Sequence, residues 1–386
     1  MILFLCFSFL VSCQSVPPEI VTKQTYLEFD EGIGELSRGL LTKLQQRQGS
    51  LPTKKTLLFN PFLEINSGQI LQASLDIEEK FIEEVHQHFN HFEISRLTLS
   101  KLEMADYIVN GLIKYEGNLD SNRKYYQISA AIVDLSTKTV VTNGTVWIES
   151  SGLNYKPTPS YEDNPIYIKG KLLQYVIKTV NSPVGTLIDD NDYTFIKTKA
   201  QLIEAQTAYD NNNYKQALNL FNAVLARPNG KVIETYGGLY ATHFKLGHLE
   251  EAERNFGKMV VLGAKKGTLP VKFLFQSQMR DFVEIPALIQ QYAIWVRQIS
   301  LYFKRFPTQC VYIIGHTSKY GIYDLNKELS KKRAEKIQNL MGQTFAGIFQ
   351  RSKTIGRGSD EMIVGTTPDS AENAIDRRVE FKIINC

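Results

Sequence analysis

The chain has 386 residues, with 44 lysines and arginines against 40 aspartates and glutamates, which gives a formal net charge of +4. A domain averages about 150 residues, so this length predicts two or three domains, and we expect three. Hydrophobic residues make up 43% and charged residues 22% of the chain, which excludes a disordered chain and a multi-span membrane protein. The small, dispersed net charge gives no reason to expect nucleic acid as a partner.

The first predicted element is an exported leader. Residues 2–12 (ILFLCFSFLVS) form an apolar run that suits the core of a signal peptide but is too short to span a bilayer. The run carries no lysine or arginine before it, unlike most export signals. A misplaced start codon would explain that departure, and a plain signal or a buried helix ending by chance in cysteine is the alternative.

The end of this run, Leu-Val-Ser-Cys at 10–13, resembles the lipobox at which signal peptidase II cuts before a lipid-modified cysteine. The resemblance implies that residues 1–12 are removed, that Cys13 carries the fatty acyl chains, palmitate among them, and that residues 13–26 form a tether. Gln14, where retained lipoproteins carry aspartate, resembles the sorting pattern for the outer membrane. We therefore expect an outer-membrane lipoprotein that faces the periplasm.

Residues 27–150 are predicted to fold as an α/β sandwich with one helical face. Leucines at helical spacing predict a helix at 29–48, and a second amphipathic helix is expected at 76–89. Strands are predicted from β-branched and aromatic content, and the last two are joined by a polar turn at 135–138. The predicted strands are 55–63, 107–115, 125–134 and 139–148.

The segments ADYIVNGLIKY and YYQISAAIVDLSTKTVV resemble the FlgO-type flagellar lipoprotein domain and its relatives in curli secretion and cell-wall synthase activation. The resemblance covers residues 27–150 and depends on pattern, not on reactive side chains. It implies a domain that binds a protein partner.

Prolines and polar residues predict a linker at 151–194 that contains one helix, at 165–179. Residues 195–266 then contain a repeat, because YKQALNLF and LEEAERNF place alanine and phenylalanine at equivalent positions. The spacing from Ala217 to Ala252 is 35 residues, close to the tetratricopeptide period. We predict two helical hairpins whose alanines and phenylalanines form core and carry no chemistry.

Residues 268–386 carry the strongest functional pattern. An apolar strand at 311–314 is followed by the polar loop GHTSKYG and a helix over IYDLNKELSKKRAEKIQNLM. A glycine-rich loop, TIGRGSDEMIVGT, and a closing strand, AIDRRVEFKI, are predicted next. Taken in order, these motifs resemble the OmpA-like peptidoglycan-binding domain, which implies a βαβαββ fold.

The resemblance also implies a ligand, the diaminopimelate of the peptidoglycan stem peptide, which carries ammonium and carboxylate groups. In the family, a loop aspartate takes the ammonium and an arginine fifteen residues later takes a carboxylate through its planar fork. Arg333 matches that arginine, but Ser318 stands where the aspartate is expected. A neutral hydroxyl binds an ammonium without charge assistance, so this departure weakens the implied site.

Other residues are candidates for completing the site. Asp376 is the first candidate for the missing negative charge and Asp324 the second, although Asp324 has the alternative role of capping the helix. Asn326 and Arg377 complete the predicted binding set, with loop ordering and a solvated strand edge as their respective alternatives. His316 is expected to be a hydrogen-bonded loop residue.

Two cysteines remain after the leader is removed, and exported proteins oxidise their thiols. In the family, the final strand pairs antiparallel with the strand before the GHT loop. The resemblance thus places Cys310, which begins one strand, beside Cys386, which ends the other. We predict a disulfide between them.

An enzyme is the alternative to a binding protein. The sequence holds no HExxH, no GxSxG and no metal-spaced cluster, so we predict no enzymatic activity, cofactor or metal. Within the binding class, the first reading is a tether that holds the membrane to the wall. The second is an assembly or regulatory lipoprotein of a flagellar, secretion or wall-synthesis complex, in which residues 27–266 bind the protein partner and the wall domain only localises them.

Overall fold

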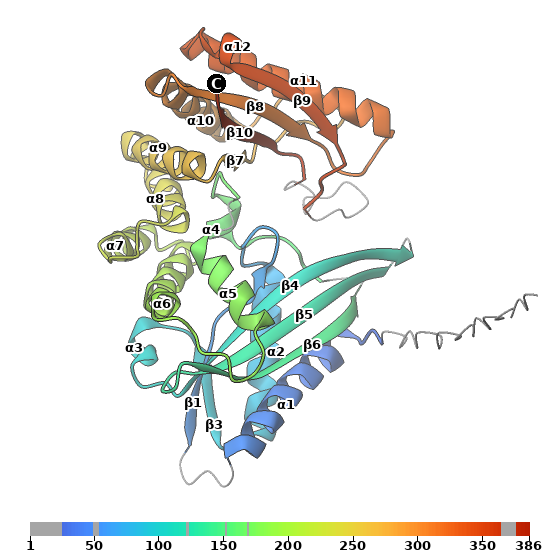
Figure 1. Ribbon diagram of the computed structural model, residues 1–386, viewed down its shortest axis with the longest axis vertical. Coiled ribbons are helices and arrows are strands. Elements are labelled where there is room, and N and C mark those ends of the chain that lie inside the picture. Colours follow the sequence, from blue (N-terminus) through green and yellow to red (C-terminus); the bar gives the residue numbers. More distant parts are fainter. Residues whose placement is uncertain (1–24, 49–53, 121–122, 151–152, 168–169, 364–375) are drawn as a thin grey trace, which may run out of the picture.

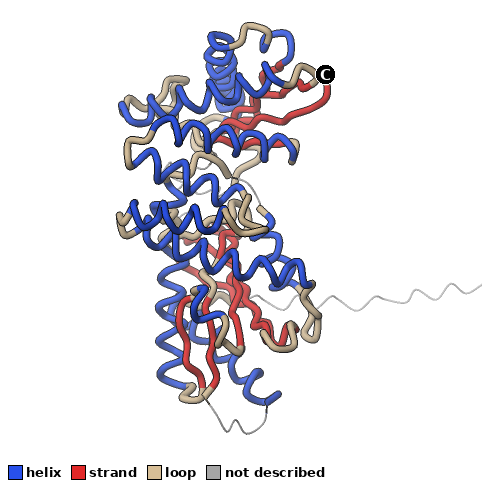
Figure 2. The backbone as a smooth tube through the Cα atoms, turned by 90° about the vertical axis from the view of Figure 1, so that its left-hand side faces the viewer, coloured by secondary structure: helices blue, strands red, loops and turns tan. Residues whose placement is uncertain are grey.

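The computed structural model describes residues 25–48, 54–120, 123–150, 153–167, 170–363 and 376–386. The predicted signal peptide and Cys13 lie outside these residues. Two sheets occupy the two ends of the long axis, and a stack of helices lies between them (Figures 1 and 2). Within the described residues, none of the helices combines the length and the apolar character needed to cross a bilayer.

The N-terminal part is built on a mixed sheet with the strand order β3-β1-β4-β5-β6, to which β2 adds by pairing with β4. β1 pairs in parallel with β3 and β4, and β4, β5 and β6 form an antiparallel meander. The elements are α1 (Phe29–Gln48), β1 (Lys55–Phe59), β2 (Leu63–Glu64), α2 (Gln72–His88), β3 (Phe92–Arg96), α3 (Leu99–Leu102), β4 (Tyr107–Asp120), β5 (Arg123–Asp134) and β6 (Thr139–Ser150).

Helices cover both faces of this sheet. One face packs against α1 and α2 and buries Leu57 and Val109, whereas the neighbouring residues Leu58 and Ile108 point to the opposite core. That second core is closed by α5 (Lys171–Asn181) and by the first half of α6 (Asp190–Asp210). The expectation of one helical face is therefore wrong. The apolar runs of the central strands are the physical reason, since both sides of each strand need burial.

The expected linker at 151–194 is also corrected, because much of it is packed structure. Its helix begins at Lys171, later than predicted, and Leu173 and Val176 are buried against the sheet. A short helix, α4 (Pro159–Glu162), precedes it. Two antiparallel hairpins follow, formed by α6 with α7 (Tyr214–Leu225) and by α8 (Ile233–Lys245) with α9 (Leu249–Lys265). The repeat positions are core, as expected, and are fully buried: Ala217, Phe221, Ala252 and Phe256.

The C-terminal part has the predicted βαβαββ order, with one short extra helix. The expectation of a loop at TIGRG is wrong, because residues 354–358 belong to strand β9 and pair with β8. Its sheet has the order β7-β10-β8-β9, in which β8 and β9 are parallel and β10 is antiparallel to both β7 and β8. The elements are β7 (Thr268–Val271), α10 (Pro286–Arg305), β8 (Gln309–His316), α11 (Tyr323–Thr344), α12 (Ile348–Arg351), β9 (Ser352–Gly358) and β10 (Val379–Asn385).

Two motif glycines let α11 lie directly on this sheet. A Cβ on Gly315 would come within 1.9 Å of the Ser330 carbonyl oxygen, and one on Gly356 within 2.2 Å of the Lys327 carbonyl oxygen. Both obstacles are helix backbone and cannot rotate away. The glycines of GHT and GRG therefore set the distance between helix and sheet, and with it the position of every side chain on α11.

The C-terminal sheet is joined to the rest of the chain at its β7 edge. Ile166 forms a β-bridge with Val271, the Tyr167 amide donates to the Pro270 carbonyl at 3.2 Å, and the Lys272 amide donates to the Pro165 carbonyl at 3.0 Å. On the other side, α10 and the helical hairpins share one hydrophobic core. The hairpins thus obtain part of their burial from the C-terminal part.

Candidate functional site

The GHT loop between β8 and α11 is held closed by hydrogen bonds. The Thr317 amide donates to the Gly358 carbonyl at 2.8 Å, and Asn326 Nδ2 donates to the Tyr320 carbonyl at 3.0 Å. Gly321 has a φ of 104°, a conformation that residues with a side chain rarely adopt. The contact of Asn326 orders this loop, which was the alternative considered for it.

Arg333 lies on α11 beneath a turn that precedes α10. Its side chain is only 2% exposed. Nε donates to the Met279 carbonyl at 3.0 Å, Nη2 donates to the Gln276 carbonyl at 3.1 Å, and the guanidinium lies over the Phe275 ring at 4.9 Å. Backbone oxygens therefore occupy two of the donors that the family resemblance assigns to a ligand carboxylate.

The segment that covers Arg333 is a small hairpin, residues 275–282, which is stabilised by its own bridge, hydrogen bond and ion pair. Phe275 and Phe282 form an antiparallel bridge, and the Gln276 amide donates to the Asp281 carbonyl at 2.8 Å. Lys336, one turn after Arg333 on α11, pairs with the Asp281 carboxylate at 2.7 Å and lies over the Phe282 ring. This 275–282 hairpin was not predicted, although two phenylalanines flanking a polar stretch are typical of one.

An open hollow of about 440 Å³ lies next to the hairpin, lined by Gln278, Tyr320, Ile322, Leu325, Asn326 and Lys332 among others. Arg333 is not among its lining residues. We expected a cleft with the Arg333 guanidinium in its wall, and the structure does not have this arrangement. The hollow and the guanidinium share the turn at Gln276–Met279, since Gln278 lines the hollow and the carbonyls of Gln276 and Met279 hold Arg333.

The other predicted site residues lie at the ends of β8 and β10. Ser318 is 5% exposed in the loop after β8, and Asp376 is fully buried and accepts a hydrogen bond from the Ile363 amide at 2.6 Å. Arg377 is partly buried. Asp324 is exposed in the first turn of α11, where Ile322 holds the capping position, so the capping alternative does not apply. The structure brings charges close to the loop but leaves few of them open to solvent.

His316 belongs to the one group of potential metal ligands among the described residues. One ring nitrogen and carboxylate oxygens of Glu361 and Glu380 lie within 4.8 Å of one another. However, burial and the guanidiniums of Arg378 and Arg357 lower the pKa of His316 to about 3. The same positive charges oppose a bound cation, so we assign no metal here. Among the described residues neither ring nitrogen has a hydrogen-bond partner, although Nε2 lies 3.9 Å from a Glu380 carboxylate oxygen, and this differs from the expectation of a hydrogen-bonded histidine.

Cys310 and Cys386 form a disulfide in the structure, with a Cα–Cα distance of 4.9 Å. Antiparallel pairing of β10 with β8 places Ile384 opposite Cys310, so Cys386 lies next to the start of β8. The bridge joins the C-terminus to the sheet.

Residues 284–376, which run from the start of α10 to the end of the segment before β10, match the family model described as the OmpA family. The C-terminal region is an OmpA-like domain. The match excludes the 275–282 hairpin and everything before it. No curated protein matches the chain.

Solved structures similar to the OmpA-like domain share its size more than its sequence. The periplasmic domain of Helicobacter pylori MotB (residues 90–256) has 16% identity over 31% of this chain and 73% of its own, with a TM-score of 0.26. The peptidoglycan-associated lipoprotein from Burkholderia pseudomallei has 24% identity over 30% and 89%, with a TM-score of 0.25. An outer membrane protein from Borrelia burgdorferi has 22% identity over 31% and 88%, with a TM-score of 0.23. At these scores the structures add no argument to the family match.

Proposed function

We propose that this protein is a non-enzymatic outer-membrane lipoprotein that binds peptidoglycan without covalent chemistry through its OmpA-like domain. The match of residues 284–376 to the OmpA family carries the proposal. The bound group is the diaminopimelate of the stem peptide, whose carboxylate and ammonium require groups of opposite charge.

Arg333 is the proposed carboxylate contact. Its guanidinium fork suits a carboxylate, but in the structure the Gln276 and Met279 carbonyls hold it. Binding through Arg333 therefore requires the turn at Gln276–Met279 to move, after which the ligand carboxylate replaces the two carbonyls. The open hollow beside the turn gives the ligand a route to that position.

The ammonium side of the site is weaker. Ser318 supplies a hydroxyl instead of a charge, and Asp376 is the nearest candidate carboxylate from the closing strand. Asp376 also has a structural task, since it accepts the Ile363 amide. We propose that Asn326 and Arg377 border the ligand, with Asn326 acting through the loop that it closes.

Sedimentation of the full-length protein with purified sacculi, in detergent, tests the proposal. The expected result is saturable binding, competed by free diaminopimelate and lost in Arg333→Met. Arg254→Met is the matched control, because Arg254 lies exposed on α9, far along the chain from α11. Equal binding by both variants would remove Arg333 from the site, and no binding by the wild-type chain would refute wall tethering.

Asp376→Ala separates the charge proposal from the Arg333 proposal in the same assay. If Asp376 supplies the missing charge, this variant binds more weakly while its fold is retained. Unchanged binding, with Arg333→Met inactive, would refute the role of Asp376 and leave Ser318 and Asp324 as candidates for the ammonium contact.

Membrane anchoring through Cys13 has its own test. Cells that express the wild-type chain and Cys13→Ser are fractionated after feeding with an alkyne-labelled palmitate analogue. Label and outer-membrane recovery are expected for the wild type only. Label on the serine variant would contradict lipidation at Cys13.

A second function is favoured by the amount of folded structure outside the match. The two-faced sheet and the helical hairpins form packed cores that a simple anchor does not need. In this alternative, residues 27–266 bind a partner in a flagellar, secretion or wall-synthesis complex, and the OmpA-like domain only localises them. A cross-linking pull-down that retains a partner in the Arg333→Met background supports it, and recovery of wall material alone by the wild-type chain opposes it.

A further inference from the structure

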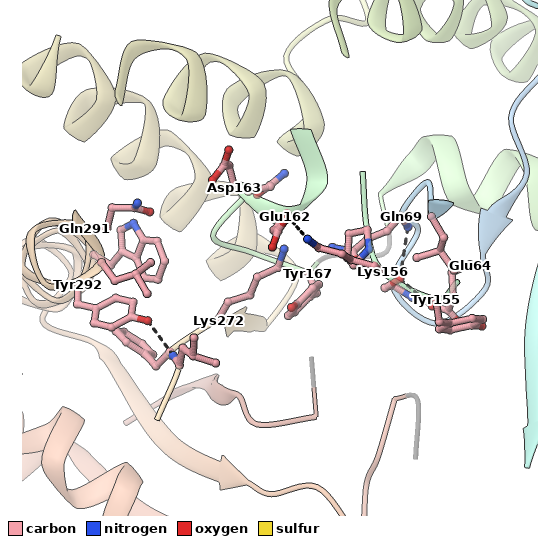
Figure 3. Close-up of a pocket in the computed structure, with 18 of the residues that line it drawn as sticks. Glu64, Gln69, Tyr155, Lys156, Glu162, Asp163, Tyr167, Lys272, Gln291 and Tyr292 are labelled. Atoms are coloured by element: carbon pink, nitrogen blue, oxygen red, sulfur yellow. Dashed lines mark hydrogen bonds and ion pairs between the residues drawn. The ribbon is translucent and has the colours of Figure 1, made fainter. Parts of the chain in front are cut away.

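A cavity of about 330 Å³ lies where the three parts of the chain meet. Its lining comes from residues 64–71 at the end of β2 and before α2, from the segment after β6, from the residues that follow β7, and from α10 (Figure 3). The volume is at the lower end of the range for small-molecule sites. None of the residues predicted to bind peptidoglycan lines it.

Lys272 brings a charge into this cavity. Nζ donates to the Tyr161 carbonyl at 2.5 Å and lies 4.2 Å from the centre of the Tyr167 ring. Within the described residues, no carboxylate oxygen pairs with Nζ at 4.0 Å or less. Figure 3 shows the side chain extended along the cavity wall toward Tyr167. A lysine in this setting has an incomplete set of partners, since an ammonium has three donors.

The other charged side chains of the cavity have ion-pair or hydrogen-bond partners. Glu162 pairs with Lys156 at 3.5 Å, and Asp163 pairs with Lys245 at 3.0 Å. Glu64 accepts from the Ser67 amide at 2.6 Å and from the Ser67 hydroxyl at 2.7 Å. Lys272 is therefore the lysine of this lining that, within the described residues, has no carboxylate oxygen within 4.0 Å, and its ammonium is the group that a ligand carboxylate would meet.

The wall opposite the polar groups is apolar and held in place. Trp295 is 3% exposed and donates its indole N–H to the Tyr240 hydroxyl at 2.6 Å, while the Tyr292 hydroxyl accepts from the Leu274 amide at 2.9 Å. Phe273 is fully buried behind them, and Leu288 lines the same wall from the next turn of α10. These contacts fix the rings before any ligand arrives, which lowers the entropy cost of binding.

We propose that this cavity is a binding site for a small carboxylate with an apolar body, whose carboxylate pairs with Lys272 and whose apolar part packs on Trp295, Tyr292 and Leu288. The carboxy-terminal residue of a short peptide and a free amphipathic acid share this chemistry. The site is independent of the proposed wall binding. Because its walls belong to three parts of the chain, an occupied cavity holds the OmpA-like domain against the remainder.

Burial lowers the pKa of Lys272 to about 7, with Asp163 and Glu162 acting in the opposite direction. A carboxylate placed on Nζ favours the charged form and raises this pKa. Ligand affinity should therefore fall as the pH rises from 7 to 9. The lysine and not the ligand titrates over this range.

Trp295 provides the readout, because the chain has 2 tryptophans and Trp147→Phe leaves Trp295 as the single emitter. The full-length Trp147→Phe protein is titrated with acetyl-leucyl-leucine as the free acid and as its carboxy-terminal amide, and in parallel with decanoate and decanamide. We expect at least one acid to quench saturably and its amide to bind about tenfold more weakly. The two pairs distinguish the peptide source from the fatty acid source.

Lys272→Met should abolish the difference between acid and amide, and Lys258→Met, on the exposed side of α9, should preserve it. Sacculus binding of Lys272→Met should stay at the wild-type level, which separates this site from the wall site. Equal binding of acid and amide would overturn the proposal. So would a preference for the acid that persists in Lys272→Met, or no saturable quenching by either acid in a protein with native circular dichroism.

Discussion

Replacement of Arg333 by methionine tests whether this arginine fastens the 275–282 hairpin. The variant keeps the apolar stem but loses the donors to the Gln276 and Met279 carbonyls and the contact with the Phe275 ring. Hydrogen bonds from a charged donor contribute about 1.5 to 3 kcal/mol each. The ring contact adds about 0.5 to 2 kcal/mol. Since such contributions are not additive, we expect a loss of about 4 kcal/mol in the stability of this region.

Hydrogen exchange read by mass spectrometry suits this prediction, because a chain with several cores need not unfold in one step. Amides of residues 275–283 in Arg333→Met should exchange at least a hundredfold faster, while those of β4 and β5 keep their wild-type rates. Arg333→Lys retains the charge and part of the bonding, so its effect should be intermediate. Arg254→Met is the control and should change nothing in this segment.

Wild-type exchange of residues 275–283 in Arg333→Met would refute the fastening role. A companion variant then distinguishes fastening from ligand binding. Asp281→Ala removes the ion pair with Lys336 and loosens the hairpin without touching the guanidinium. If the turn must move before the wall ligand reaches Arg333, Asp281→Ala should bind sacculi more tightly than the wild type, and weaker binding would contradict that order of events.

Three further predictions concern stability. Gly315→Ala should cost about 3 kcal/mol or more, measured by urea unfolding, because its Cβ would meet the Ser330 carbonyl, and a loss under 1 kcal/mol would show that α11 can shift. Lys272 has a folded pKa of about 7 against an ordinary value of 10.5, so the unfolded chain binds the extra proton between these values. The free energy of unfolding of the wild type, relative to that of Lys272→Met, should therefore rise as the pH increases from about 7 to 10.5, and this gain should be absent below pH 7. If the two proteins show the same dependence of unfolding free energy on pH, the low pKa of Lys272 is contradicted. The Cys310–Cys386 bridge closes a separation of 76 residues, for which chain entropy gives up to about 4 kcal/mol. Cys310→Ser/Cys386→Ser should unfold at lower urea than the oxidised wild type and match the reduced protein, which a thiol count verifies.

β8, α11 and β10 were predictable because each has its own periodicity, whereas the full order of the OmpA-like domain followed from the resemblance to the family. The burial of Arg333 under the 275–282 hairpin could not be predicted from the sequence. The oxygens that hold it belong to Gln276 and Met279, and backbone carbonyls leave no trace in a sequence pattern. Likewise, Lys272 and Trp295 share a cavity only because the chain folds three parts around it.

The single helical face expected for the N-terminal sheet was an avoidable error. Alternating polar residues are typical of a sheet with one side in water, and β1 and the middle of β5 do not alternate. Leu57, Leu58 and Phe59 are consecutive and fully buried. That run already indicated cover on both sides, and the segment assigned as a linker was the part of the chain available to provide it.

The pairing of residues 165–167 with β7 has a consequence for how molecules of this protein behave at high local concentration. β7 is the outermost strand of its sheet, and an outermost strand with open amides and carbonyls invites strands from neighbouring molecules. Here a short stretch of the same chain occupies that position, and Pro270 lacks the amide that a further strand would need. Densely packed copies are thereby prevented from joining sheet to sheet along this side.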